Sequence, residues 1–123
     1  MAGDPRDVLE VLRYELSYLE QGGYRRNGDG ALNSPFQASY SCLNFGNPLR
    51  PHACRECLLS EFVPEWARTE DVPCHYIQLN GGETVASLMA SGDRTRLVLG
   101  LEQWLRATIA RLSALRERDA KSA

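Results

Sequence analysis

The stretch that decides the fold is residues 42–74, which read CLNFGNPLRPHACRECLLSEFVPEWARTEDVPC. It holds all four cysteines of the 123-residue chain: Cys42, Cys54, Cys57 and Cys74. The middle two form a C-x-x-C pair, whose spacing lets both sulfurs reach one tetrahedral metal ion at about 2.3 Å. The other two lie eleven intervening residues before the pair and sixteen after it. We therefore predict one metal site with a close pair and two single ligands.

Two histidines lie beside these cysteines. His52 is two residues before Cys54, and His75 directly follows Cys74. Adjacent residues rarely both reach one metal ion, so His75 could replace Cys74 in a site with three cysteines and one histidine. We expect both histidines to surround the ligands, and direct ligation is the alternative.

Four thiolates suit Zn²⁺, and they equally suit an iron–sulfur cluster, so the spacing does not separate these two cofactors. We expect zinc, with the cluster as the alternative. A third interpretation has no metal. In it Cys54 begins a short helix beside Arg55, which would lower the thiol pKa and make a reactive thiolate.

The apolar residues outside this stretch fall on two helical faces. Leu9, Leu12, Leu16 and Leu19 recur at helical spacing in a helix predicted over 5–21, capped by Asp4-Pro5 and ended by a glycine pair. A long helix is predicted over 93–118, with one face made of Leu97, Leu101, Trp104, Leu105, Thr108, Leu112 and Leu115.

The segments between these helices contain many residues that favour turns. We predict a loop over 24–41, the four-cysteine knuckle over 42–80, a short helix over 84–90 and a disordered tail over 119–123. Within the knuckle, residues 75–79 predict a short strand. The fold class is therefore mostly α, a single domain over 1–118. Its terminal amphipathic helices pack together around an irregular, metal-stabilised knuckle with little β structure.

Two helices alone make a thin core, so the same apolar faces could instead complete a bundle in an oligomer. We therefore expect a protein partner or a homo-oligomer to bind through the helix faces. Phe62 and Trp66 are expected to pack the knuckle onto the helices.

The net charge of −2 argues against a protein that coats nucleic acid. Tyr24, Phe36, Tyr40 and Phe45 could stack with bases, but we expect Tyr40 and Phe45 to wrap the knuckle instead. No zinc-hydrolase or deaminase motif occurs, and a shell of four cysteines leaves no open metal position. We therefore expect a binding or accessory module acting through protein–protein contacts, not an enzyme. The alternative is an electron-transfer or redox-sensing iron–sulfur protein.

The first residues include no apolar leader segment, and no stretch approaches the roughly 18 apolar residues that a membrane helix needs. We therefore expect a cytoplasmic protein without membrane contact. Thiols stay reduced in the cytoplasm, which favours metal ligation over disulfides there.

Overall fold

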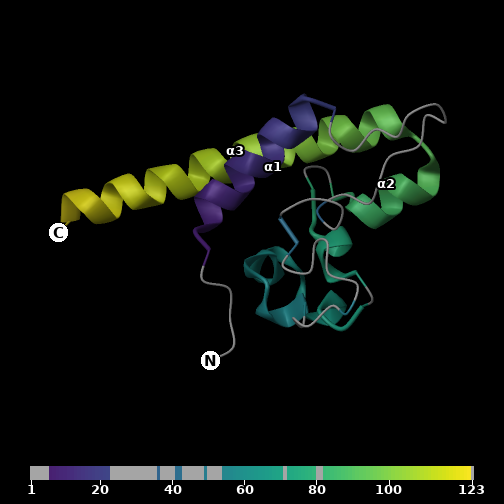
Figure 1. The fold of residues 1–123 in the computed structure, drawn as a ribbon, viewed down its shortest axis with the longest axis horizontal. Coiled ribbons are helices and arrows are strands. Elements are labelled where there is room, and N and C mark those ends of the chain that lie inside the picture. Colours follow the sequence, from purple (N-terminus) through teal and green to yellow (C-terminus); the bar gives the residue numbers. More distant parts are fainter. Residues whose placement is uncertain are drawn as a thin grey trace.

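Figure 1 shows the computed structural model of the chain, which describes residues 6–22, 36, 41–42, 49, 54–70, 72–79 and 82–122. The α-helices are α1 (Val8–Glu20), α2 (Val85–Ser91) and α3 (Arg94–Ser122). Four 3₁₀ turns lie between α1 and α2: η1 (Cys54–Glu56), η2 (Leu58–Phe62), η3 (Glu65–Ala67) and η4 (Pro73–Tyr76). The described ranges contain no strand, so the prediction of a mostly helical chain is confirmed.

Helix α1 starts where Asp7 caps it, because the Asp7 carboxylate accepts a hydrogen bond from the Glu10 N–H at 3.1 Å. The sequence predicted a start at Pro5 with Asp4 as the cap. Residues 1–5 lie outside the described part of the chain, and the cap at Asp7 moves the start inward. Three leucines of the predicted face are buried: Leu9, Leu12 and Leu19.

Helix α3 buries most of the face that the sequence predicted. The buried members are Leu97, Leu101, Trp104, Leu105 and Thr108. Leu112 packs against the core, and Leu115 at the end of the row is 38% exposed. Helix α2 approaches this face closely at Gly100. A Cβ there would lie 3.4 Å from Leu88 Cδ1, in ordinary van der Waals contact, so the two helices are closely packed at this point.

The end of α3 differs from the prediction. The sequence predicted a disordered tail over 119–123, and the structure continues the helix to Ser122, one residue short of the chain end. The last turns contain good helix formers and no Gly or Pro, so nothing local stops the helix.

Helices α1 and α3 run antiparallel (Figure 1). Polar ties at successive heights along the pair fix this register: Glu20 with Arg106, Arg13 with Ser113 and Asp7 with Arg116. Because these side chains lie at the surface, the ties specify alignment more than they add stability.

The described residues of 54–79, hereafter the cysteine lobe, lie on one side of the helix pair (Figure 1). Phe62 meets the Trp104 ring edge-on with centroids 5.3 Å apart, and the buried Phe36 does so at 6.3 Å. Phe62 therefore joins the lobe to α3 as predicted. Phe36, one of the residues that could have stacked with bases, is fully buried and offers no surface for stacking. The prediction for Trp66 was wrong, because Trp66 is 67% exposed.

The strand predicted over residues 75–79 was also wrong. Pro73 begins η4, and only Gln78 forms a bridge, with Thr84. A proline fixes φ near the helical value, which favours a turn at this point. The loop predicted over 24–41 lies largely outside the described residues.

The apolar faces of α1 and α3 are covered within the single chain. Leu12, Leu101 and Leu105 are each at most 1% exposed, and they share one core cluster with Leu59 and Ile77 of the lobe. The lobe therefore supplies the packing that two helices lack. An oligomer formed through this face would need it to be exposed. No described helix is long and apolar enough to cross a membrane.

Leu101 and Leu99 provide a matched test of this packing, since they lie on one helix and are 1% and 52% exposed. We expect Leu101→Ala to lower the free energy of unfolding by about 2–5 kcal/mol, the cost of a cavity in a closed core. Leu99→Ala should change it by less than about 0.5 kcal/mol. Urea unfolding of both variants measures the difference, and equal losses would contradict the described core.

The Asp7–Arg116 pair predicts a pH dependence. The hydrogen bond from Arg116 lowers the pKa of Asp7 below 3.8. Its contribution to stability is therefore present above pH 3.8 and lost as the pH falls through the lower, folded-state value. Asp7→Asn keeps a good cap but removes the charge. We expect this variant to melt slightly below the wild type at neutral pH, and the difference to shrink as the pH falls below 3.8. A difference independent of pH would assign the effect to the cap.

Candidate metal centre

The C-x-x-C pair is held in shape by its own backbone. The Cys57 N–H donates to the Cys54 carbonyl at 3.0 Å, which closes the turn η1. Residues three apart in a 3₁₀ turn lie on the same side. The backbone of the close pair is therefore folded in the way that shared ligation needs, and ligation by both sulfurs stays a prediction.

Cys74 lies in η4, where the His75 N–H donates to the Val72 carbonyl at 3.0 Å. The turn η4 packs against η2, whose N-cap is Cys57. Cys57 and Cys74 both pack against the core cluster. Contact between the two turns thus joins the close pair to a cysteine sixteen intervening residues away.

Cys42 is positioned through its neighbour, Ser41. Ser41 is fully buried, and its hydroxyl donates to the carboxylate of Glu15 on α1 at 2.5 Å. Glu15 is itself 1% exposed. A buried carboxylate needs such donors, because an unpaired charge in the core is costly. This contact anchors residue 42 against the N-terminal helix.

The electrostatics of Cys74 connect all four cysteines. Its thiol pKa is raised far above the ordinary 9.0, first by burial and then by the charges of Cys57, Cys42 and Cys54. Like charges raise the pKa of a thiol only when they lie near it. Contacts connect the segments of three of the four cysteines: Arg6 donates to Ser41 beside Cys42 and to Cys57, and η2, capped by Cys57, packs against η4 with Cys74.

Arg6, just before α1, reaches two of these segments. Its guanidinium donates to the Ser41 carbonyl at 2.9 Å and to the Cys57 sulfur at 3.9 Å. A cation beside a thiolate favours the charged form of the sulfur, which is the form that binds metal. Arg6 thus ties the segment before α1 to two of the cysteine-bearing segments.

The four cysteines do not form a coordination shell in the described structure. No group of three or more Cys, His, Asp or Glu side chains there is arranged to hold a metal ion. Tetrahedral zinc with sulfurs at about 2.3 Å needs them about 3.8 Å apart. All four cysteines are described, partly exposed and free of disulfides.

Of the two histidines, His75 lies in the described part of the chain. The charges that raise the pKa of Cys74 are those of the other cysteines, and no described histidine is among them. His75 lines a pocket with Glu70 and Tyr76, which is described below. His52 lies outside the described residues, as do Tyr24, Tyr40 and Phe45. The role of either histidine as a ligand stays a prediction.

Sequence reasoning missed Arg6, Glu15 and Ser41. Glu15 could have been noticed from the sequence. It lies two helical turns after the apolar Val8, beside the row of leucines that faces the core. A carboxylate next to a buried helix face needs a hydrogen-bond partner. Nothing in the sequence identifies Ser41 as the partner of Glu15, or Arg6 as a partner of Ser41. These two contacts join residues that are 26 and 35 positions apart.

Comparison with known proteins adds no relative: no family model, no curated protein and no solved structure matches the chain. The function is therefore inferred from the residues and their contacts.

Arg6 and Arg13 provide a matched test of the tie between the helix pair and the cysteines. Arg6→Gln removes a cation from Cys57 and Ser41, whereas Arg13→Gln removes only the exposed bond to Ser113 at 3.2 Å. We expect Arg6→Gln to cost roughly 1–2 kcal/mol, because hydrogen bonds to charged groups contribute more than neutral ones. Arg13→Gln should cost less than about 0.5 kcal/mol.

Chemical unfolding of the two variants, as purified, makes this comparison. Arg6→Gln should also increase the rate at which a thiol reagent labels the cysteines, since the segment holding Ser41 loses its anchor. Identical stability and labelling in both variants would show that Arg6 has no structural role at the cysteines.

Proposed function

We propose that the protein is a small binding module whose cysteine lobe is held by one metal ion on Cys42, Cys54, Cys57 and Cys74. The metal is Zn²⁺, and the module acts by contact with a protein partner. The contacts between the cysteine-bearing segments carry the proposal: η2 packs against η4, and Arg6 donates to both the Ser41 carbonyl and the Cys57 sulfur. No disulfide links the four cysteines.

The architecture of the lobe supports a structural role for the metal. Its regular elements are four turns of three to five residues. Such turns carry few internal hydrogen bonds, so short 3₁₀ segments need support from packing or ligation. A metal that joins Cys42 and Cys74 to the C-x-x-C pair would close the lobe against both α1 and η4.

The chemistry of the shell favours binding over catalysis. Four thiolates around Zn²⁺ complete a tetrahedron, so no position remains for water or substrate. The lobe also presents an aromatic side chain to solvent, Trp66. Tryptophan is enriched at the centres of protein interfaces, which supports a partner-binding role. A cytoplasmic location, where the thiols stay reduced, is part of the same proposal.

Metal analysis tests the proposal. On protein purified without added metal or oxygen, we expect about one zinc ion per chain and no visible absorption band. Iron with sulfide and a broad visible band would instead support the second candidate, an iron–sulfur redox protein. Protein that is folded and contains neither metal would contradict the metal site.

Substitution separates the ligands from their surroundings. Cys57→Ser removes a ligand, and Glu56→Gln changes a carboxylate within the C-x-x-C pair while keeping all four thiols. We expect Cys57→Ser to lose the zinc and lower the melting temperature by more than roughly 10 °C, because metal binding and folding are coupled. Glu56→Gln should keep the zinc and the wild-type melting temperature. Retention of zinc by the Cys57→Ser protein would overturn the ligand assignment.

A further inference from the structure

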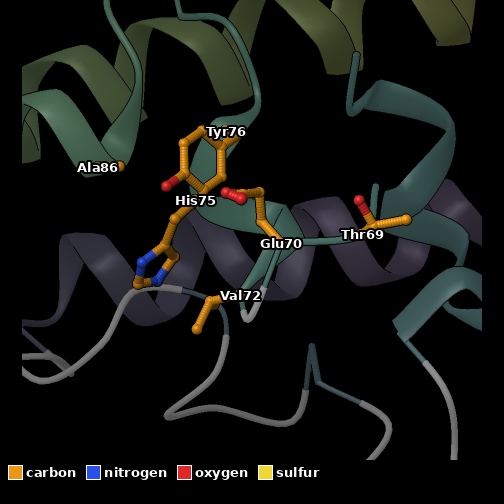
Figure 2. Close-up of a pocket in the computed structure, with 6 residues that line it drawn as sticks. All are labelled: Thr69, Glu70, Val72, His75, Tyr76 and Ala86. Atoms are coloured by element: carbon orange, nitrogen blue, oxygen red, sulfur yellow. The ribbon is translucent and has the colours of Figure 1, made fainter. Parts of the chain in front are cut away.

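A second site lies on the lobe, in the segment that follows η3. A pocket of about 290 Å³ opens there, lined by Thr69, Glu70, Val72, His75, Tyr76 and Ala86. We name it the Glu70 pocket. Figure 2 shows the Glu70 carboxylate directed toward the turn that carries His75 and Tyr76. The pocket thus joins the η3–η4 segment, η4 and one residue of α2.

The pocket combines a carboxylate with an aromatic wall. The Tyr76 ring lines it, and the exposed Trp66 meets Tyr76 edge-on with centroids 5.7 Å apart. Aromatic faces attract cations, and a carboxylate binds a guanidinium through charged hydrogen bonds. Burial does not explain the position of Trp66, since the ring is 67% exposed. The geometry suits a cation held between Glu70 and the Tyr76 ring, with Trp66 next to Tyr76.

The charged side chains of the segment that carries the pocket are mostly acidic. Across the described residues 58–79, the charged side chains are Glu61, Glu65, Glu70 and one arginine, Arg68. The Arg68 Nε–H donates to the Val63 carbonyl at 3.1 Å, so that cation is engaged within the lobe. Zinc bound by four thiolates would add a net charge of about −2. The local field therefore favours a positive ligand.

The size of the pocket indicates one side chain. Pockets for small molecules span about 300–1,000 Å³, and this one is just below that range. Arginine fits the combination better than lysine, because its planar guanidinium stacks on aromatic rings while it pairs with a carboxylate.

We infer that the Glu70 pocket binds an arginine side chain of a basic segment in a protein partner. The inference rests on the proposed function, since it names the chemistry of the partner that the module contacts. The Tyr76 ring contacts one guanidinium face, Trp66 lies beside Tyr76 at the exposed edge, and Glu70 accepts the guanidinium hydrogen bonds. The cysteine site holds the lobe in shape, and the pocket recognises the partner.

The test uses the full chain, metal-loaded as purified, and three capped peptides of the form Gly-X-Gly-X-Gly, with X as arginine, lysine or citrulline. Citrulline keeps the shape of arginine without the charge. Trp66 is the exposed one of two tryptophans, so its fluorescence reports occupancy, and calorimetry gives an independent affinity. We expect saturable binding of the arginine peptide, weaker binding of the lysine peptide and none of the citrulline peptide.

Two exposed carboxylates of the lobe make the matched variants. Glu70→Gln should weaken the arginine peptide about three- to tenfold, because it removes the paired charge from the pocket. Glu61→Gln changes the net charge equally outside the pocket and should weaken it less than about twofold. Trp66→Ala should weaken binding in calorimetry. Circular dichroism checks that all three variants stay folded.

Three outcomes would overturn the inference. The citrulline peptide could bind as well as the arginine peptide, the two carboxylate variants could lose affinity equally, or no peptide could bind at millimolar concentration. Zinc content measured on the same samples keeps the two proposals apart. If folded, zinc-loaded protein does not bind the arginine peptide, only the arginine-pocket proposal is contradicted. If folded protein contains no metal, the metal-site proposal is contradicted.

Discussion

Burial of one face of α3 is the interaction on which the rest of the described structure depends. Helix α1 covers part of that face, α2 meets it at Gly100, and Phe62 of the cysteine lobe packs on Trp104. None of these elements is long or apolar enough to form a core alone. Because they share one surface, the loss of any one exposes apolar area that belongs to the others.

The cysteine lobe depends on this shared surface and on polar ties together. The Glu15–Ser41 hydrogen bond and the Arg6 guanidinium bring the Cys42 segment to the start of α1. Contact between η2 and η4 brings Cys74 to the C-x-x-C pair. A metal at the four thiols would therefore bind segments that the core has already placed near one another, which lowers the entropic cost of assembling the site.

Separate parts of the lobe serve stability and recognition in this view. The thiols lie partly covered among the turns, and Glu70 and Trp66 are exposed. A rigid support matters for recognition, because a side chain that is already positioned loses less entropy when a partner binds. The proposed metal and the proposed arginine site are thus physically linked through η4, which bears Cys74, His75 and Tyr76.

The sequence by itself determined the helices and most of their inward faces, because helical periodicity and caps act within a few residues. It also identified the four cysteines, since ligand spacing is local within the C-x-x-C pair. It could not locate Arg6 or Ser41 beside them, and it placed Trp66 inside when the fold leaves it exposed. Only the tertiary structure decided those positions, because they depend on contacts between residues far apart in the chain. The same reason applies to the Glu70 pocket, which forms where the η3–η4 segment meets α2. Short-range propensity determines which residues turn or coil. The packing of those turns on α3 determines which side chains meet, and no local pattern encodes that packing.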